Sequence, residues 1–202
     1  GYPVNISLPG MLHAKILRSP YPHAWVRRID TSEAERLPGV KAVLTAKDVP
    51  QIPFCPVYFV PTDAKSVIRD MLILSDRVRF AGQPVAAVAA ISEEIAEKAL
   101  GLIDVDYEEL PTVFDPEEAM LPDAPVLHHK EADSRIQRPG QNIFVQIDSE
   151  YGNVKAGFEE AEVVVEGTYF SNKIQHAHLE THIAIASRSE DGRIHVRTSS
   201  QA

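Results

Sequence analysis

Leu8-Pro-Gly-Met-Leu-His-Ala-Lys-Ile-Leu-Arg-Ser-Pro-Tyr-Pro-His-Ala24 is the stretch that decides the fold. From Met11 to Arg18 it is apolar and tolerant of β structure, and Pro20 and Pro22 then follow. Two prolines two residues apart exclude a helix, because each lacks an amide proton and each restricts the residue before it. The stretch therefore predicts a strand that ends in a rigid, extended corner.

Short strands and short helices are predicted after this corner. We expect strands over residues 24–29, 40–44, 84–90 and 105–108, and helices over residues 33–37, 93–103 and 116–119. Ser32 and Glu35 have the spacing of a capping box, and Ser92 is a candidate N-cap for the second helix. Because these elements do not repeat as βαβ crossovers of roughly 30 residues, the pattern favours an α+β fold over a doubly wound sheet.

The character of the chain changes after the third helix. Residues 121–140 hold prolines and polar side chains without periodicity, so we interpret them as a linker between a domain at 1–120 and a domain at 141–202. We expect the pair His128-His129 in this linker to be exposed. In the second domain the patterns predict these elements: strands over 142–148, 163–170 and 183–189, a helix opened by Asn153, and an Asp191-Gly192 hairpin turn.

Composition excludes several classes of protein. The formal charge of −9 and the absence of a basic stripe argue against broad nucleic-acid binding. A single cysteine, Cys55, cannot form an internal disulfide or supply the ligand set of an iron–sulfur cluster, and no basic neighbour in sequence favours its thiolate. No apolar run reaches the roughly 18 residues of a membrane span, and no signal peptide is evident. A reduced, cytoplasmic protein is the expectation.

Four segments, in order, carry a resemblance to a known family. They are residues 8–24, residues 37–50 (Leu-Pro-Gly-Val-Lys-Ala-Val-Leu-Thr-Ala-Lys-Asp-Val-Pro), residues 78–111, which begin Val-Arg-Phe-Ala-Gly-Gln-Pro-Val, and Gln175-His-Ala-His-Leu-Glu-Thr181 with Thr198-Ser-Ser-Gln201. Together they resemble the N-terminal portion of the large, molybdopterin-binding subunit of molybdenum hydroxylases, the family of xanthine dehydrogenase, aldehyde oxidase and 4-hydroxybenzoyl-CoA reductase. The resemblance implies an α/β-hammerhead domain over residues 1–120 and an incomplete molybdenum-cofactor-binding domain over residues 141–202.

The resemblance also implies a function. Family members are oxidoreductases that act on an aldehyde, an N-heterocycle or an aroyl-CoA, with molybdenum on molybdopterin and with iron–sulfur clusters and FAD on partner domains or subunits. This chain has no Gly-Gly-Gly-Phe-Gly loop and no counterpart of the family's glutamate base, so we expect no catalytic residue in it and no activity in isolation. Its expected partners are the remainder of the molybdenum-binding subunit, the iron–sulfur and FAD subunits, and, through uncovered apolar faces, further copies of itself. The alternative is a non-catalytic structural or interaction protein that retains the hammerhead fold.

Three residues are candidates for the cofactor pocket on the strength of the resemblance. Gln201 matches the glutamine of the family's Ser-Thr-Gln element, with Ser200 in place of threonine, and would donate an amide hydrogen bond near the molybdenum. His176 and Glu180 match an element that supports the pocket through a buried polar network. For Gln201 the alternative is a polar residue at a strand end. For His176, His178 and Glu180 the alternative is a zinc site of the hydrolase kind, although the family uses no histidine ligand here.

Two further groups are interpreted as structural. Gly82-Gln83-Pro84 is predicted to form a turn that serves the fold, with the next strand starting at Pro84. The alternative, which the family resemblance implies, is a turn that faces the neighbouring cofactor domain. Alternation places Asp104, Asp106 and Glu108 on one strand face, which predicts a solvated edge strand.

Overall fold

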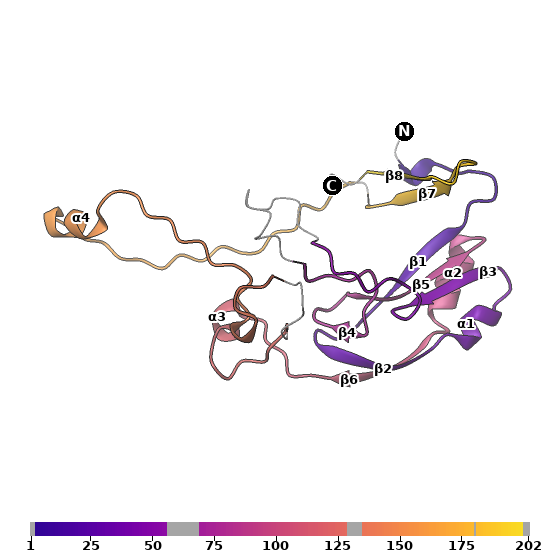
Figure 1. Ribbon diagram of the computed structural model, residues 1–202, viewed down its shortest axis with the longest axis horizontal. Helices are drawn as coiled ribbons and strands as arrows, with labels where there is room; N and C mark the ends of the chain where they lie inside the picture. Colours follow the sequence, from indigo (N-terminus) through magenta and orange to yellow (C-terminus); the bar gives the residue numbers. More distant parts are fainter. Residues whose placement is uncertain (1–2, 56–68, 129–134, 180, 200–202) are drawn as a thin grey trace. The chain divides into compact units, whose positions relative to one another are not determined.

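The computed structural model describes residues 3–55, 69–128, 135–179 and 181–199. The chain forms two compact units, one of residues 8–146 and one of residues 147–202 with residues 1–7. The strands and helices of residues 13–119 belong to the first unit, and those of residues 154–198 belong to the second; Figure 1 labels them along the chain. In the described part of the chain no helix is long and apolar enough to cross a membrane.

The larger core of the first unit lies between a three-stranded sheet and a helix. Antiparallel strands β1 (His13–Arg18), β5 (Pro84–Ala90) and β3 (Val40–Thr45) pair in the order β1-β5-β3. Helices α1 (Ser32–Arg36) and α2 (Glu93–Leu100) lie against this sheet (Figure 1). The central strand turns Ala86, Val88 and Ala90 into the core. Small side chains on both sides let the helix approach closely, so the core is well packed despite few large residues.

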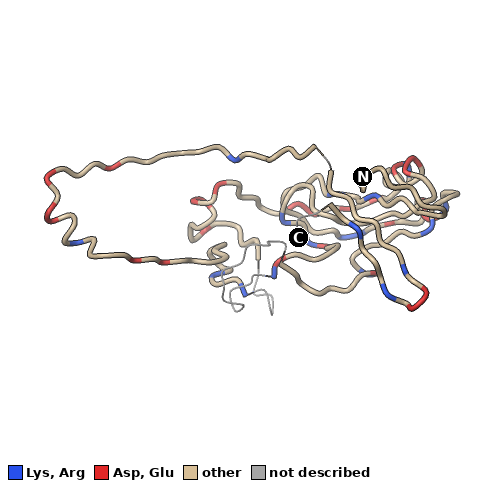
Figure 2. Tube along the Cα trace, turned by 90° about the horizontal axis from the view of Figure 1, so that it is seen from above, with Lys and Arg blue, Asp and Glu red and all other residues tan. Residues whose placement is uncertain are grey.

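A second small sheet completes the unit. Strands β4 (Arg77–Val78), β2 (Ala24–Asp30) and β6 (Asp104–Glu109) pair in the order β4-β2-β6, all antiparallel. Its core cluster is Ala24, Val78 and Val85. Figure 2 shows acidic and basic residues interspersed along the trace, which agrees with the absence of a basic stripe in the sequence.

Most local predictions for the first unit are confirmed, but the end of α2 and the start of α1 differ from the prediction. Ser92 Oγ accepts from the amide of Ile95 at 3.3 Å, and α2 ends one turn earlier than predicted, at Leu100 before Gly101. Helix α3 (Pro116–Ala119) begins with proline as expected. The Ser32 capping box is wrong, because α1 begins at Ser32 itself with Thr31 as its N-cap. The Ser32 amide is already bound by Asp30 Oδ1 at 3.0 Å.

In the second unit the helix and the hairpin are confirmed. Helix α4 (Val154–Glu160) is capped by Asn153, whose Oδ1 accepts from the amide of Ala156 at 3.0 Å. Strands β7 (Ala184–Arg188) and β8 (Ile194–Thr198) pair across the Asp191-Gly192 turn. The short 3-10 helix η1 (Pro3–Asn5) lies in the same unit.

Two predicted strands are wrong. Over 142–148 no strand forms, because Asn142, after the 3-10 helix η3 (Pro139–Gln141), has φ of 55° and turns the chain back, so that Ile143 bridges Arg138. Over 163–170 no strand forms, since these residues pair with no described strand, and Val165 is 85% exposed. A strand needs a partner for its backbone groups, and sequence alternation alone does not supply one.

Candidate cofactor-facing segment

Two of the three predicted pocket residues, Gln201 and Glu180, lie outside the described residues, as does His129. The structure does describe the residues that lead to Gln201. Strand β8 ends at Thr198, which pairs with Ala184 of β7, and Thr198 Oγ1 donates to the carbonyl of Ile183 at 2.9 Å. A side-chain hydrogen bond therefore extends the pairing by one residue at the open end of the hairpin.

The turn at the other end of the hairpin is also held by hydrogen bonds. The Ser189 amide donates to the carbonyl of Arg193 at 2.9 Å, and Gly192 adopts φ of 84°, a conformation that favours glycine. Hydrogen bonds from the Ser189 hydroxyl and the Arg193 amide lower the pKa of the Asp191 carboxyl. These contacts fix the hairpin register, and the register determines which residues follow β8.

The chemistry of β8 and its flanks suits an anionic group. From Arg193 to Gln201 the sequence contains two arginines and a histidine, and no aspartate or glutamate. His195 and Arg197 occupy alternate positions of β8, which lie on the same side of the strand, whereas Arg193, just before the strand, pairs with Asp191 at 3.2 Å. A strand that carries His195 and Arg197, and is followed in the sequence by the neutral donors Ser199, Ser200 and Gln201, is compatible with a ligand that has phosphate and oxo oxygens, such as a molybdopterin. The residues present therefore fit the cofactor that the resemblance implies.

A ladder of imidazole rings precedes the hairpin. The rings of His176 and His178 stack with centroids 5.6 Å apart and planes at 9°, and His182 stacks on His178 at 5.5 Å. This stacking occurs although the segment is not a strand and Ala177 has φ of 51°. In the second unit taken by itself the three rings are exposed, so a supporting role for His176 stays a proposal. Among the described residues no group of three or more histidine, cysteine, aspartate or glutamate side chains could hold a metal ion.

In the first unit, the proline corner at residues 19–22 and the turn at residues 82–84 are hydrogen-bonded to each other. Ser19, at the start of the proline corner, donates its amide to the carbonyl of Gln83 at 3.0 Å, and its carbonyl accepts from the amide of Gly82 at 2.8 Å. The buried Gln83 side chain accepts from the amide of Arg79 at 2.7 Å and donates to the carbonyl of Arg77 at 3.0 Å. The predicted turn at Gly82-Gln83-Pro84 is confirmed, and it binds other residues of the first unit, whereas a role toward the cofactor domain stays an alternative.

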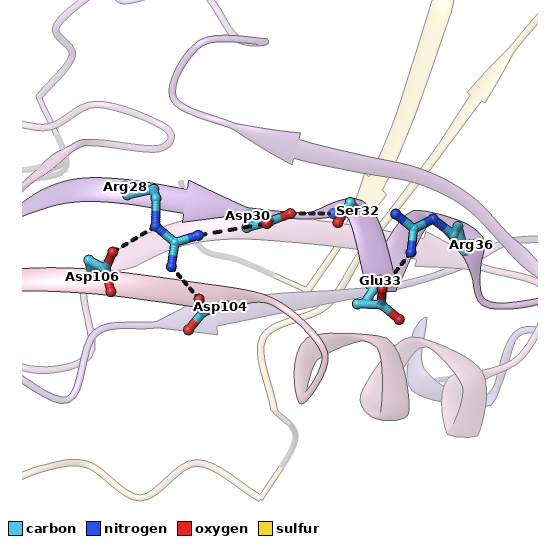
Figure 3. Close-up of polar contacts among 7 residues, drawn as sticks. All are labelled: Arg28, Asp30, Ser32, Glu33, Arg36, Asp104 and Asp106. Carbon is cyan, nitrogen blue, oxygen red and sulfur yellow. Dashed lines mark hydrogen bonds and ion pairs between the residues drawn. The ribbon is translucent and has the colours of Figure 1, made fainter.

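The predicted solvated edge is confirmed at β6, and the structure adds the cations that neutralise it. Arg28 donates from Nε to Asp106 at 2.7 Å and from Nη2 to Asp104 at 2.5 Å, while its Nη1 lies 3.6 Å from Asp30 (Figure 3). Glu108 pairs with Arg27. All these side chains are about half exposed or more. The cluster is therefore a surface ion-pair network on a strand edge.

The prediction that His128 is exposed is wrong. This residue is only 5% exposed, and its ring lies against Phe144. Burial, together with the positive charges of Arg79 and Arg77, lowers the pKa of His128 to about 4. Nothing in the sequence around His128 indicated this burial, because the segment has no periodicity. The only available signal was the pair Arg77 and Arg79 followed by Gln83, a group of polar side chains that can bind the backbone of another segment. Cys55 is half-buried, and its low reactivity stays a prediction.

Comparison with known proteins also divides the chain into two parts, although the second family model begins inside the first compact unit. A family model described as "Aldehyde oxidase and xanthine dehydrogenase, a/b hammerhead domain" matches residues 1–111, and a "Molybdopterin cofactor-binding domain" model matches residues 135–202. A probable xanthine dehydrogenase subunit of Bacillus subtilis is 40% identical over 192 residues, which are 95% of this chain and 23% of that protein. The xanthine dehydrogenase molybdenum-binding subunit of Escherichia coli is 35% identical over 99% of this chain and 26% of its own length.

Solved structures agree with the sequence relatives. A Cu,Mo-CO dehydrogenase superposes with a TM-score of 0.83 at 33% identity, over 100% of this chain and 26% of that one. The aldehyde oxidoreductase of Desulfovibrio gigas superposes with a TM-score of 0.80 at 30% identity, over 96% and 21%. This chain thus spans about a quarter of the length of the curated relatives it matches. The chain belongs to the aldehyde oxidase and xanthine dehydrogenase family and corresponds to part of a molybdopterin-dependent hydroxylase large subunit, with a hammerhead domain followed by the start of the molybdopterin-binding domain.

Proposed function

We propose that this chain forms the hammerhead domain and one wall of the molybdenum-cofactor pocket in the large subunit of a molybdenum-containing oxidoreductase. The observation that carries the proposal is the β7–β8 hairpin. Its register is held at both ends, its second strand is cationic and free of acids, and it leads directly to Ser199, Ser200 and Gln201. A pocket wall requires such a rigid element, because donors on a fixed strand end are positioned more closely than donors on a free loop.

The residues of this chain would bind and orient the cofactor rather than transform a substrate. The molybdenum cofactor, when bound, supplies the redox chemistry of oxygen transfer to or from a carbon centre. Gln201 would donate an amide hydrogen bond to an oxygen ligand at the metal without adding charge. His176 and Glu180 would belong to a buried polar network that supports the pocket. No residue of this chain acts as the general base in the proposal.

The proposal extends to partners and substrates. The proposed substrate is an aldehyde, an N-heterocycle or an aroyl-CoA, and relatives include proteins named for xanthine, carbon monoxide and nicotinate. The partners would be the rest of the molybdenum-binding subunit and the domains or subunits that carry iron–sulfur clusters and FAD, in the cytoplasm. We expect no turnover from residues 1–202 alone, because the other walls of the pocket come from elsewhere.

The test uses Gln201→Ala in the complete, assembled enzyme. Removal of one hydrogen-bond donor at a charge-bearing centre costs about a hundredfold to a thousandfold in kcat. We therefore expect kcat to fall by about that factor while the molybdenum and pterin contents per subunit stay at the wild-type level. Gln201→Glu should impair turnover at least as much, since it places an acceptor and a charge where a donor is needed.

The matched control is Gln51→Ala, which removes an amide in the first unit that binds the carbonyl of Ala46. This control should leave kcat unchanged. Wild-type kcat in Gln201→Ala would show that Gln201 is only a polar residue at a strand end. An assembled protein that holds no molybdenum cofactor at all would support the alternative of a structural or interaction protein.

A further inference from the structure

The described residues 119–128 and 135–146, which we call the strap, lie against the first unit instead of leaving it. Two arginines of the β4 region bind the backbone of this strap. Arg77 donates from Nη2 to the carbonyl of Val126 at 3.2 Å, and Arg79 donates from Nε to the carbonyl of Leu127 at 3.1 Å. Both bonds join positions almost fifty residues apart in the sequence. They are bonds from charged donors, which are stronger than bonds between neutral groups.

Asn142 ties the strap to itself at three points. Its Oδ1 accepts from the amide of Leu127 at 2.9 Å, and its Nδ2 donates to the carbonyls of Ala119 and Pro125, each at 2.9 Å. Leu127 is thus held from both sides, with its amide on Asn142 and its carbonyl on Arg79. The backbone of Asn142 has φ of 55°, a left-handed conformation that asparagine tolerates better than most residues. Both the backbone and the side chain of this position therefore favour asparagine.

Two side chains of the strap, Ile136 and His128, are buried, and the aromatic partner of His128 is a strap residue as well. Ile136 is 8% exposed, and His128 packs edge-on against Phe144 with ring centroids 5.3 Å apart. A backbone hairpin stabilises the far end, because Gln137 and Phe144 are joined by a 3.0 Å hydrogen bond and Arg138 and Ile143 donate to each other's carbonyls at 3.1 Å. The compact unit that contains these contacts extends to Gln146.

We propose that Asn142, with Arg77 and Arg79, is a latch that makes the strap an integral part of the hammerhead unit and fixes Gln146 as the residue at which the chain leaves that unit. The hammerhead family model ends at residue 111 and the cofactor-binding family model begins at residue 135, so neither model covers residues 112–134. The latch gives the described part of this interval a role. It anchors the described residues 119–128 and 135–146 within the first unit, in contrast to a free linker over 121–140. Asn142 is in this sense a positioning residue.

The experiment is amide hydrogen exchange on the full chain with Asn142→Gly. Glycine keeps the left-handed backbone conformation and removes only the three side-chain hydrogen bonds. We expect the amides of residues 119–128 to exchange at least about tenfold faster, since each lost bond to a buried group is a substantial penalty. The amides of β1, β5 and β3 should keep their wild-type rates. Asn142→Asp keeps the acceptor for Leu127 and should give an intermediate result.

The titration of His128, followed by NMR of its ring protons, separates a latch from a merely stabilising residue. In Asn142→Gly the ring gains access to water, so its pKa should rise from about 4 toward the ordinary value. The control is Asn153→Gly, which removes a helix cap in the second unit and should change neither the strap nor His128. Unchanged strap exchange and an unchanged His128 titration in Asn142→Gly would overturn the proposal. A uniform loss of protection through the whole first unit would overturn it as well, because the position would then be a general core residue.

Discussion

The imidazole of His128 meets the ring of Phe144 edge to face, at a centroid distance of 5.3 Å and an interplanar angle of 69°. Charged and titratable groups face it besides the aromatic ring. Burial disfavours a proton on His128 most, and the guanidinium groups of Arg79 and Arg77 and the imidazole of His23 disfavour it further. The Asp70 carboxylate lies 3.9 Å away, beyond hydrogen-bonding distance. His128 is therefore a neutral imidazole at neutral pH.

The stability of the first unit should fall in mild acid because of this residue. Burial and Arg79 lower the pKa of His128 from 6.5 to about 4, so the neutral form is favoured in the folded state. The contribution of neutral His128 to the free energy of unfolding is fully present above pH 6.5. It is lost as the pH falls from 6.5 toward about 4, and the loss reaches up to about 3 kcal/mol. Urea denaturation over this pH range, followed by the fluorescence of Trp25, the sole tryptophan, measures the effect on the first unit alone.

The variant His128→Phe isolates that contribution from the titration of carboxylates. It keeps an aromatic ring beside Phe144 and removes the titrating group. We expect the difference in unfolding free energy between the variant and the wild type to change with pH only between about 6.5 and 4. A difference that is constant with pH would show that His128 is not buried as a neutral ring.

Gly39 should not tolerate a side chain. It adopts φ of 99°, and an added Cβ would lie 2.7 Å from Cδ1 of Ile95 and 3.1 Å from Cγ1 of Ile91. Gly39→Ala then combines backbone strain of about 1–2 kcal/mol with overpacking of about 1–3 kcal/mol. Gly10→Ala is the matched control, because Gly10 has φ of 74° and open space around it, so it incurs the strain alone. If the two variants unfold at the same urea concentration, the contact with α2 is not tight.

The Arg28 network should respond to salt. Arg28 binds Asp104 and Asp106 on the neighbouring strand and approaches Asp30 on its own. Arg28→Gln leaves three carboxylates without their shared cation, so the unfolding midpoint should fall at low ionic strength, and the difference should shrink in high salt because exposed charges are screened. Arg36→Gln, which removes a pair with Glu33, is the control and should show a smaller salt effect. A variant effect that does not depend on salt would point to packing by the Arg28 stem instead.

Residues 147–199 should exchange their amides faster than the first unit, and the isolated chain should self-associate. Large apolar side chains are uncovered in this second unit, among them Tyr169 and Phe170, both 90% exposed. Phe170→Ser should therefore weaken a concentration-dependent oligomer seen by sedimentation. Phe114→Ser, at an exposed phenylalanine of the first unit, should have little effect. Equal amide protection in the two units would contradict this prediction.

Local sequence signals determined the elements that depend on neighbouring residues only. Ser92, Asp115 and Asn153 each cap the helix that follows, since a cap bonds to an amide two or three residues away. The Asp191-Gly192 turn likewise sets its own hairpin register. The four motif segments also sufficed to place the chain in its family, because they occur in order along nearly its whole length.

The tertiary structure decided everything that depends on a distant partner. The expected strand over 163–170 has no described strand to pair with, and the predicted strand over 142–148 is displaced by the left-handed turn at Asn142. The burial of His128 depends on Arg77, Arg79 and Phe144, residues that no local pattern connects to it. Caps and turns depend on hydrogen bonds between residues that are close in the sequence. Burial and strand pairing depend on segments that are distant in the sequence and meet only after folding.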